Sequence, residues 1–126
     1  MRRALVLLAL LWTGCGPTLY AASVPPPGAI GRLDTDDRVA ELTQGAALAV
    51  RCDDGGPCKR ARAVSDNPAI ADVRPAALAQ LELAGFDGMA PASTFVIVAK
   101  RPGTTRIRVR SSDGDTSLRV TVLPPP

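Results

Sequence analysis

The chain has 126 residues, with 15 basic against 12 acidic side chains, no histidine and three cysteines. This length supports one domain. The near balance of charge is unlike that of a polybasic nucleic-acid binder or a disordered acidic tail. Without histidine the chain lacks the commonest general base and the commonest zinc ligand. We therefore expect no catalysis, no cofactor and no metal site.

The first fourteen residues predict an export signal. Residues 1–3 are a basic head, and residues 4–12 are an uninterrupted apolar run. This run is too short to span a membrane, which takes about 20 residues, but it is typical of a secretory signal. Removal of residues 1–14 leaves 13 basic against 12 acidic residues, so the mature protein is nearly neutral.

The end of this signal, Leu11-Trp12-Thr13-Gly14-Cys15, resembles a bacterial lipobox. The departure is Trp12, because the lipobox pattern prefers leucine three residues before the cysteine. The resemblance implies cleavage before a Cys15 that carries a diacylglyceryl group and an acyl chain such as palmitate. It also implies attachment to a membrane of the cell envelope, with the outer membrane, on its periplasmic or surface side, as the favoured place. Ordinary secretion and a retained anchor are the alternatives.

Residues 15–35 are interpreted as the lipidated cysteine followed by a proline-rich tether. Residues 25–27 are three consecutive prolines, which favour a polyproline II path without ladder hydrogen bonds. At about 3.1 Å per residue the tether would reach roughly 50 Å. No site role is expected for Tyr20 within it. The folded domain is predicted over residues 36–123, and residues 124–126 are a proline tail.

Within the domain the dominant hydrophobic period is two. Arginine alternates with isoleucine or valine over residues 106–110, and residues 117–122 repeat the pattern around a turn at residues 111–115. This pattern predicts a hairpin with one solvated face, and the apolar run 94–99 predicts a buried strand. Weaker strands are predicted at residues 39–43, 46–52, 60–65 and 69–73. The fold class is therefore all-β, a sandwich of about seven strands.

Residues 75–84 allow two interpretations. Pro75 at a first turn and Gly85 as a C-cap favour a helix. The alternation of leucine with Gln80 and Glu82 favours a strand. We favour a strand that begins with a short helical turn.

Residues 64–73, VSDNPAIADV, resemble the S-x-N-P-A-I-A-x-V stretch of bacterial Ig-like domains of group 2 (BIG2). Within this stretch Asn67-Pro68 predicts a turn between two strands. Residues 102–109 and 118–122 resemble later strands of that family, and Gly45 matches its glycine before the second strand. The resemblance covers roughly residues 38–123, and the chain departs from the pattern in a cysteine pair and the long stretch 75–93. It implies an Ig-like sandwich that binds or spaces partners in the cell envelope.

Cys52 and Cys58 bracket a Gly-Gly-Pro turn. In an oxidising envelope we expect them to form a disulfide, worth about 2 kcal/mol in the chain-entropy model. Free thiols are one alternative. A metal site is another, but it needs two further ligands, and only Asp53 and Asp54 are near. Redox catalysis is less favoured because catalytic pairs have only two residues between the cysteines.

A second candidate site is a set of four arginines, which we call the arginine face: Arg106, Arg108, Arg110 and Arg119. Residues two apart on a strand project together, so these side chains could attract an anionic glycan such as phosphorylated lipopolysaccharide, an anionic lipid or an acidic polymer. The alternative is a solvated face whose charge is offset by Asp113, Asp115 and Glu82. Nucleic acid is not expected as a partner because no aromatic residue interleaves with the arginines.

These features together predict a monomeric, lipid-anchored envelope protein whose single domain acts as a binding or spacing module. Its partners would be the membrane, through the lipid, and an envelope protein or an anionic glycan. One alternative is a structural accessory without a specific ligand. Another is a periplasmic inhibitor or partner of an envelope protein.

Overall fold

The described part of the chain consists mainly of strands in two layers. The computed structural model describes residues 16–21, 29–76 and 93–125, and these contain nine strands. In chain order they are β1 (Thr18–Ala21), β2 (Gly31–Asp34), β3 (Val39–Thr43), β4 (Ala47–Asp53), β5 (Arg62–Ser65), β6 (Ala71–Pro75), β7 (Thr94–Ala99), β8 (Gly103–Ser111) and β9 (Gly114–Leu123).

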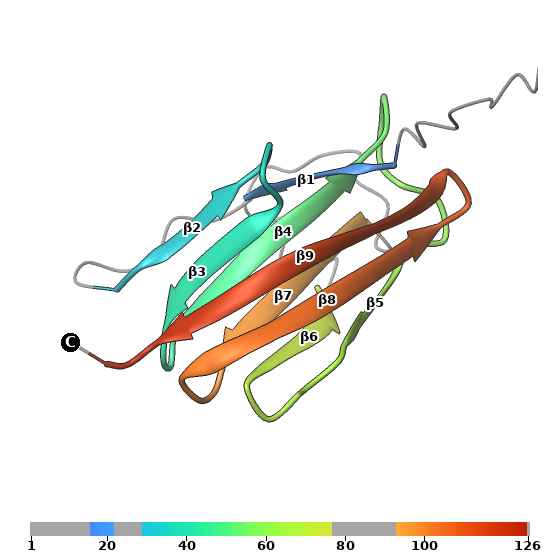
Figure 1. Ribbon diagram of the computed structural model, residues 1–126. Helices are drawn as coiled ribbons and strands as arrows, with labels where there is room; N and C mark the ends of the chain where they lie inside the picture. The colour runs from blue at the N-terminus through green and yellow to red at the C-terminus, as the bar shows by residue number, and fades with distance from the viewer. Residues whose placement is uncertain (1–15, 22–28, 77–92, 126) are drawn as a thin grey trace, which may run out of the picture.

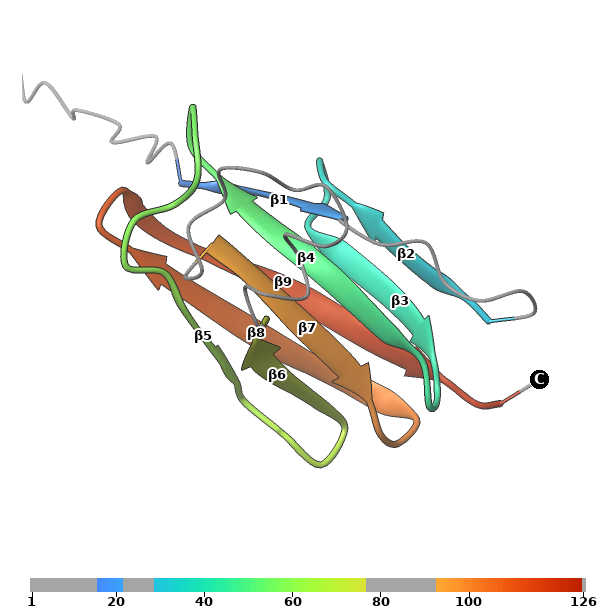
Figure 2. The ribbon, with the colours of Figure 1, turned by 180° about the vertical axis from the view of Figure 1, so that it is seen from behind.

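The strands form two sheets that pack face to face (Figure 1), and the same two layers are seen from behind in Figure 2. One sheet has the order β1-β4-β7-β6 and the other has the order β2-β3-β9-β8-β5. The pairing of β3 with β9 is parallel, and the other pairs of neighbouring strands are antiparallel. The predicted all-β sandwich is confirmed, with nine described strands where about seven were predicted.

Several strands coincide with the sequence-based predictions. The strands β3 and β7 have the predicted bounds, and β8 and β9 form the predicted hairpin, which turns at Ser112 and Asp113. Alternation explains this accuracy, because Thr105, Ile107 and Val109 are buried while the arginines between them are exposed. One face of the hairpin therefore joins the core and the other faces solvent. The ambiguous segment 76–84 lies outside the described residues from residue 77 onward.

The start of the folded domain was predicted too late, because both β1 and β2 lie within the segment interpreted as a tether. Leu19 of β1 pairs with Cys52 of β4 and is buried, and β2 forms a hairpin with β3. Each strand has only four residues, which is too short for a reliable period, and prolines dominate the composition around them. These short strands form because the folded structure gives them strand partners, which their own sequence does not predict.

The core lies between the sheets and is mainly aliphatic. Its largest fully buried apolar side chains are Leu42, Leu48, Ile97, Ile107, Leu118, Val109 and Val120. Phe95 is the one buried aromatic residue among the described positions. Each side chain of this size contributes about 1.5–3 kcal/mol on burial, so the domain depends on many moderate contributions.

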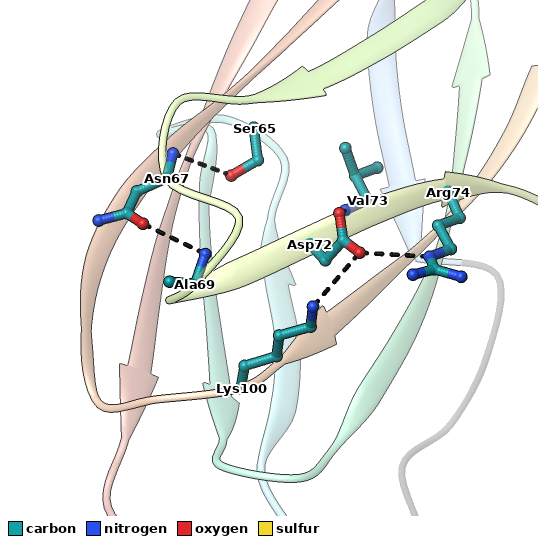
Figure 3. Close-up of polar contacts among 7 residues, drawn as sticks. All are labelled: Ser65, Asn67, Ala69, Asp72, Val73, Arg74 and Lys100. Carbon is teal, nitrogen blue, oxygen red and sulfur yellow. Dashed lines mark hydrogen bonds and ion pairs between the residues drawn. The ribbon is translucent and has the colours of Figure 1, made fainter.

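The connection between β5 and β6 carries the chain from one sheet to the other at Asn67. The Asn67 side-chain oxygen accepts a hydrogen bond from the Ala69 N–H at 3.2 Å, and the Ser65 hydroxyl accepts one from the Asn67 N–H at 3.3 Å (Figure 3). The carbonyl of Ile70 then accepts a hydrogen bond from the Lys100 N–H at 2.8 Å. The predicted turn at Asn67 is thus confirmed, and it also ties β6 to the connection between β7 and β8.

Asp72, at the start of β6, holds an ion-pair group on the outside of the smaller sheet. Its carboxylate lies 3.2 Å from the Arg74 guanidinium and 3.5 Å from the Lys100 ammonium (Figure 3). Partial burial raises the pKa of this carboxyl, but the hydrogen bond from Arg74, the charge of Lys100 and the Val73 N–H lower it, and the resulting pKa is below its ordinary value. The carboxylate therefore stays ionised and links β6 to the β7–β8 connection.

Gly103 opens β8 at a point where a side chain would strain the backbone and crowd Ile70. Its φ angle is 145°, and a Cβ atom there would lie 3.0 Å from the Ile70 Cδ1 atom. Gly103→Ala should lower the free energy of unfolding by about 1–3 kcal/mol, from the strained backbone together with the contact. Urea denaturation measures this change.

The variant Ile70→Val provides the control, because it removes the crowded methyl group. If the contact contributes, the double variant Gly103→Ala/Ile70→Val should lose less stability than the sum of the two single losses. Strict additivity would show that the steric contact with Ile70 contributes nothing.

Candidate binding face

The structure places all four residues of the arginine face on the solvent side of the five-stranded sheet. Arg106, Arg108 and Arg110 alternate with buried residues along β8, and Arg119 is exposed on β9. Arg106 and Arg119 are direct cross-strand partners in the antiparallel register. The two strands thus bring residues thirteen positions apart in sequence into one pair.

The structure adds Arg62 to this surface, a residue that the predicted arginine face lacks. Arg62 is exposed on the edge strand β5 and lies opposite Arg110. Next to it Val64 lies opposite Arg108 with 64% of its surface exposed. The alternation of arginine with alanine from residue 60 to 63 could have indicated an outward-facing arginine. The neighbour of that strand, however, is decided only by the fold.

Two of these arginines form ion pairs with nearby acidic residues. The Arg108 guanidinium pairs with both carboxylate oxygens of Asp66, at 3.1 and 3.2 Å. Arg110 lies 4.0 Å from Asp115, and both side chains are mostly exposed. Asp113 instead accepts a hydrogen bond from the backbone N–H of Lys59, and Glu82 lies outside the described residues.

The remaining arginines have no acidic partner within the described part of the chain: Arg62, Arg106 and Arg119. Like charges placed directly opposite on neighbouring strands are destabilising. Exposed ion pairs contribute only about 0–1 kcal/mol each, so the two that exist offset little of this cost. The outer face of β5, β8 and β9 is therefore locally positive in a protein of nearly balanced charge.

Two shallow open hollows lie on either side of β8. The first, of about 610 Å³, lies between β8 and β5 and has Val64 in its wall with arginines around it. The second, of about 410 Å³, crosses β8 and β9 and reaches Arg38 and Arg106. Arg108 and Arg110 line both hollows. These two neighbouring hollows suit an extended ligand that lies along the sheet.

The predicted disulfide between Cys52 and Cys58 is confirmed, with Cα atoms 5.5 Å apart. Both residues are fully buried. Cys52 belongs to β4 of the four-stranded sheet, and Cys58 lies within the connection to β5 of the other sheet. The bond therefore anchors the crossing between the layers next to the strand that carries Arg62.

One acidic residue of the disulfide loop, Asp53, has a structural contact. The Asp53 carboxylate accepts a hydrogen bond from the Gly56 N–H at 3.1 Å, and Gly55 adopts a positive φ of 70° that the turn requires. In the described residues no group of three or more His, Cys, Asp or Glu side chains could hold a metal ion. Asp53 therefore acts here as a turn residue.

Tyr20, which was expected to lack a site role, contacts an arginine of the smaller sheet. The Arg51 guanidinium lies over its ring, 5.4 Å from the centroid, and 4.0 Å from the Asp53 carboxylate. A guanidinium above an exposed aromatic ring contributes about 0.5–1 kcal/mol. This contact helps to hold β1 against β4.

Cys15 and the predicted export signal lie outside the described residues, which begin at Gly16. The first strand starts at Thr18, only three residues after Cys15. No helix in the described ranges is long and apolar enough to cross a membrane.

No protein-family model matches the chain, and comparison with curated proteins gives no match. Among solved structures, domains 4 and 5 of the S-layer protein SbsC are similar with a TM-score of 0.49 and 17% identity, over 75% of this chain and 53% of that one. The structure of SbsC domains 1–6 gives a TM-score of 0.49 and 18% identity, over 75% of this chain. SbsC domains 5–6 give a TM-score of 0.45 and 16% identity, over 86% of this chain. The chain spans 13% of the six-domain structure and 45% of this second two-domain one.

Loss of the disulfide should weaken the whole domain. Cys52→Ala/Cys58→Ala should lower the free energy of unfolding by about 2–4 kcal/mol, since it removes both the cross-link and buried sulfur atoms. Denaturation of the variant, and of the wild type with and without reductant, measures the effect. If reduction of the wild type leaves its unfolding midpoint unchanged, the cross-link does not stabilise the domain.

Proposed function

We propose that this protein is a lipid-anchored module of the bacterial cell envelope that binds an anionic partner through the outer face of β5, β8 and β9 and does no catalysis. The observation that carries the proposal is the unneutralised positive charge of this face. Clustered charge of one sign raises the local concentration of opposite charge and speeds association. The partner would be an anionic glycan or the acidic surface of an envelope protein.

The proposed anchor is supported by the sequence. The basic head, the short apolar run and Thr13-Gly14-Cys15 resemble a lipoprotein signal. The placement in the envelope has the further support of the Cys52–Cys58 disulfide, because such bonds persist in oxidising compartments. The resemblance of residues 64–73 to group 2 Ig-like domains agrees with this location, and we include membership of that family in the proposal.

A second candidate function is that of a spacer without a specific ligand. Gly16 lies against the backbone of Asp115, at the end of the sandwich that holds the β8–β9 turn. Leu123 lies beside Thr43 at the opposite end. The described chain thus enters at one end and leaves at the other (Figure 1), and a ten-residue strand such as β9 spans about 33 Å. This geometry favours a module that separates what is attached at its two ends.

The lipid anchor is tested with Cys15→Ser in the full chain. We expect loss of labelled-palmitate incorporation and a shift of the protein from the membrane fraction to the soluble fraction. Thr13→Ser is the control, because it keeps the cysteine and a small residue before it. Unchanged labelling and fractionation of Cys15→Ser would refute the anchor.

Binding is tested by capture of envelope polymers with the full lipidated protein. The variant Arg106→Ser/Arg108→Ser/Arg110→Ser should lose capture of acidic material, assayed as phosphate and uronic acid. The control Arg32→Ser/Arg74→Ser/Arg101→Ser removes the same charge from other exposed positions and should retain it.

Equal capture by both triple variants would contradict the binding function. Absence of any capture by the wild type would also contradict it. In that case the spacer is supported if an unrelated anchored sandwich repairs the envelope defects of a deletion strain.

A further inference from the structure

The outer face of the larger sheet contains two facing pairs of arginines. Arg106 lies opposite Arg119 across β8 and β9, and Arg110 lies opposite Arg62 across β8 and β5. Directly opposed residues on antiparallel strands have Cα atoms about 4.5–5.5 Å apart. Each pair therefore holds two guanidinium groups within reach of one small anion.

Internal compensation within the two pairs is limited to one exposed contact. Within the described residues, no ion pair is formed by Arg106, Arg119 or Arg62, and Arg110 has only the exposed Asp115 at 4.0 Å. The repulsion within each pair disappears when an anion lies between the two guanidinium groups. Guanidinium matches the oxygen atoms of phosphate in a bidentate geometry, so each pair suits one phosphate group.

The pairs are separated by a distance that a single small anion does not span. Arg110 follows Arg106 by four positions along β8, which is about 13 Å at the rise of a strand. Arg108 stands midway, although Asp66 occupies its guanidinium. Both hollows border this row, one on each side of β8. The surface therefore fits a linear polymer with several phosphate groups.

An acidic peptide added to the free edge of β5 fits this arrangement less well. A strand added there would lie beside Arg62 and Val64. It would be three strands away from Arg119, because the order of the sheet is β9-β8-β5, and neighbouring strands are about 4.8 Å apart. Only a ligand that lies on the face itself reaches both pairs.

We propose that the two arginine pairs, Arg106 with Arg119 and Arg110 with Arg62, form two phosphate clamps that together bind a phosphate-bearing linear polymer. This inference rests on the proposed function and specifies the ligand class of the same face. Val64, exposed beside the second clamp, offers a small apolar contact to the backbone of such a polymer.

The test measures binding of the full lipidated protein, in neutral detergent, to inorganic polyphosphate of defined chain length. Each clamp is removed by one double variant, Arg106→Gln/Arg119→Gln or Arg110→Gln/Arg62→Gln. Each should raise the Kd for polyphosphate about tenfold or more, because charge-assisted hydrogen bonds are lost. The control Arg32→Gln/Arg74→Gln makes the same charge change elsewhere and should alter the Kd less than about twofold.

Thermal unfolding supplies a second measurement on the same variants. Polyphosphate should raise the Tm of the wild type and the control but not that of a protein lacking both clamps. In the absence of polymer, Arg106→Gln should not lower the Tm, since it removes a like-charge contact. A clamp variant with an intact Tm and an unchanged Kd would overturn the inference.

Competing ligands separate the remaining outcomes. Poly-glutamate of equal charge that binds as tightly as polyphosphate would overturn the phosphate clamps while leaving the anionic binding face in place. Binding only to vesicles of phosphatidylglycerol would assign the face to a lipid surface and overturn the polymer. If orthophosphate binds as tightly per phosphate group as the polymer does, the two clamps do not act together and the inference is overturned. Failure of every polyanion would overturn the clamps and the proposed binding function together.

Discussion

The register of the β8–β9 hairpin is the constraint on which both the core and the binding face depend. Nine cross-strand pairs run from Gly103 with Val122 to Ser111 with Gly114. In this register Ile107 and Leu118 point into the core, and Arg106 faces Arg119 on the outside. A slip of one residue would exchange the two faces of a strand and place arginines between the sheets. The cost of burying unpaired charge is far larger than the repulsion between exposed arginines, so the core enforces the facing pair.

The short strand β5 depends on the connections at its two ends. Before it, the disulfide of Cys58 with Cys52 holds the crossing from β4. After it, Asn67 stabilises the crossing to β6, and its N–H also donates to the Thr105 hydroxyl at 3.0 Å. A strand of four residues has little stability of its own. These two crossings therefore fix the position of Arg62, which the second proposed clamp requires.

The proposed function gives a physical reason for the facing arginines, which do not favour the stability of the free domain. Opposed arginines lower the stability of the free domain, and the exposed pairs of Arg108 with Asp66 and of Arg110 with Asp115 recover little of it. Binding of an anionic polymer would replace the repulsion between the opposed arginines with attraction to the polymer. At physiological salt, screening mainly weakens interactions between charges more than about 8 Å apart. The directly opposed arginines therefore keep most of their repulsion.

The sequence alone determined the features that depend on local chemistry. Alternation in residues 106–110 and 117–122 predicted the hairpin, the glycine turn between Cys52 and Cys58 predicted their bond, and Asn67-Pro68 predicted a turn, because each signal acts over a few residues. Only the tertiary structure decided the rest. The strands β1 and β2 exist because β4 and β3 offer them backbone partners, and Arg62 meets Arg110 because β5 crosses to the second sheet. Pairing between distant segments depends on the packing of the whole core, which no short window of sequence contains.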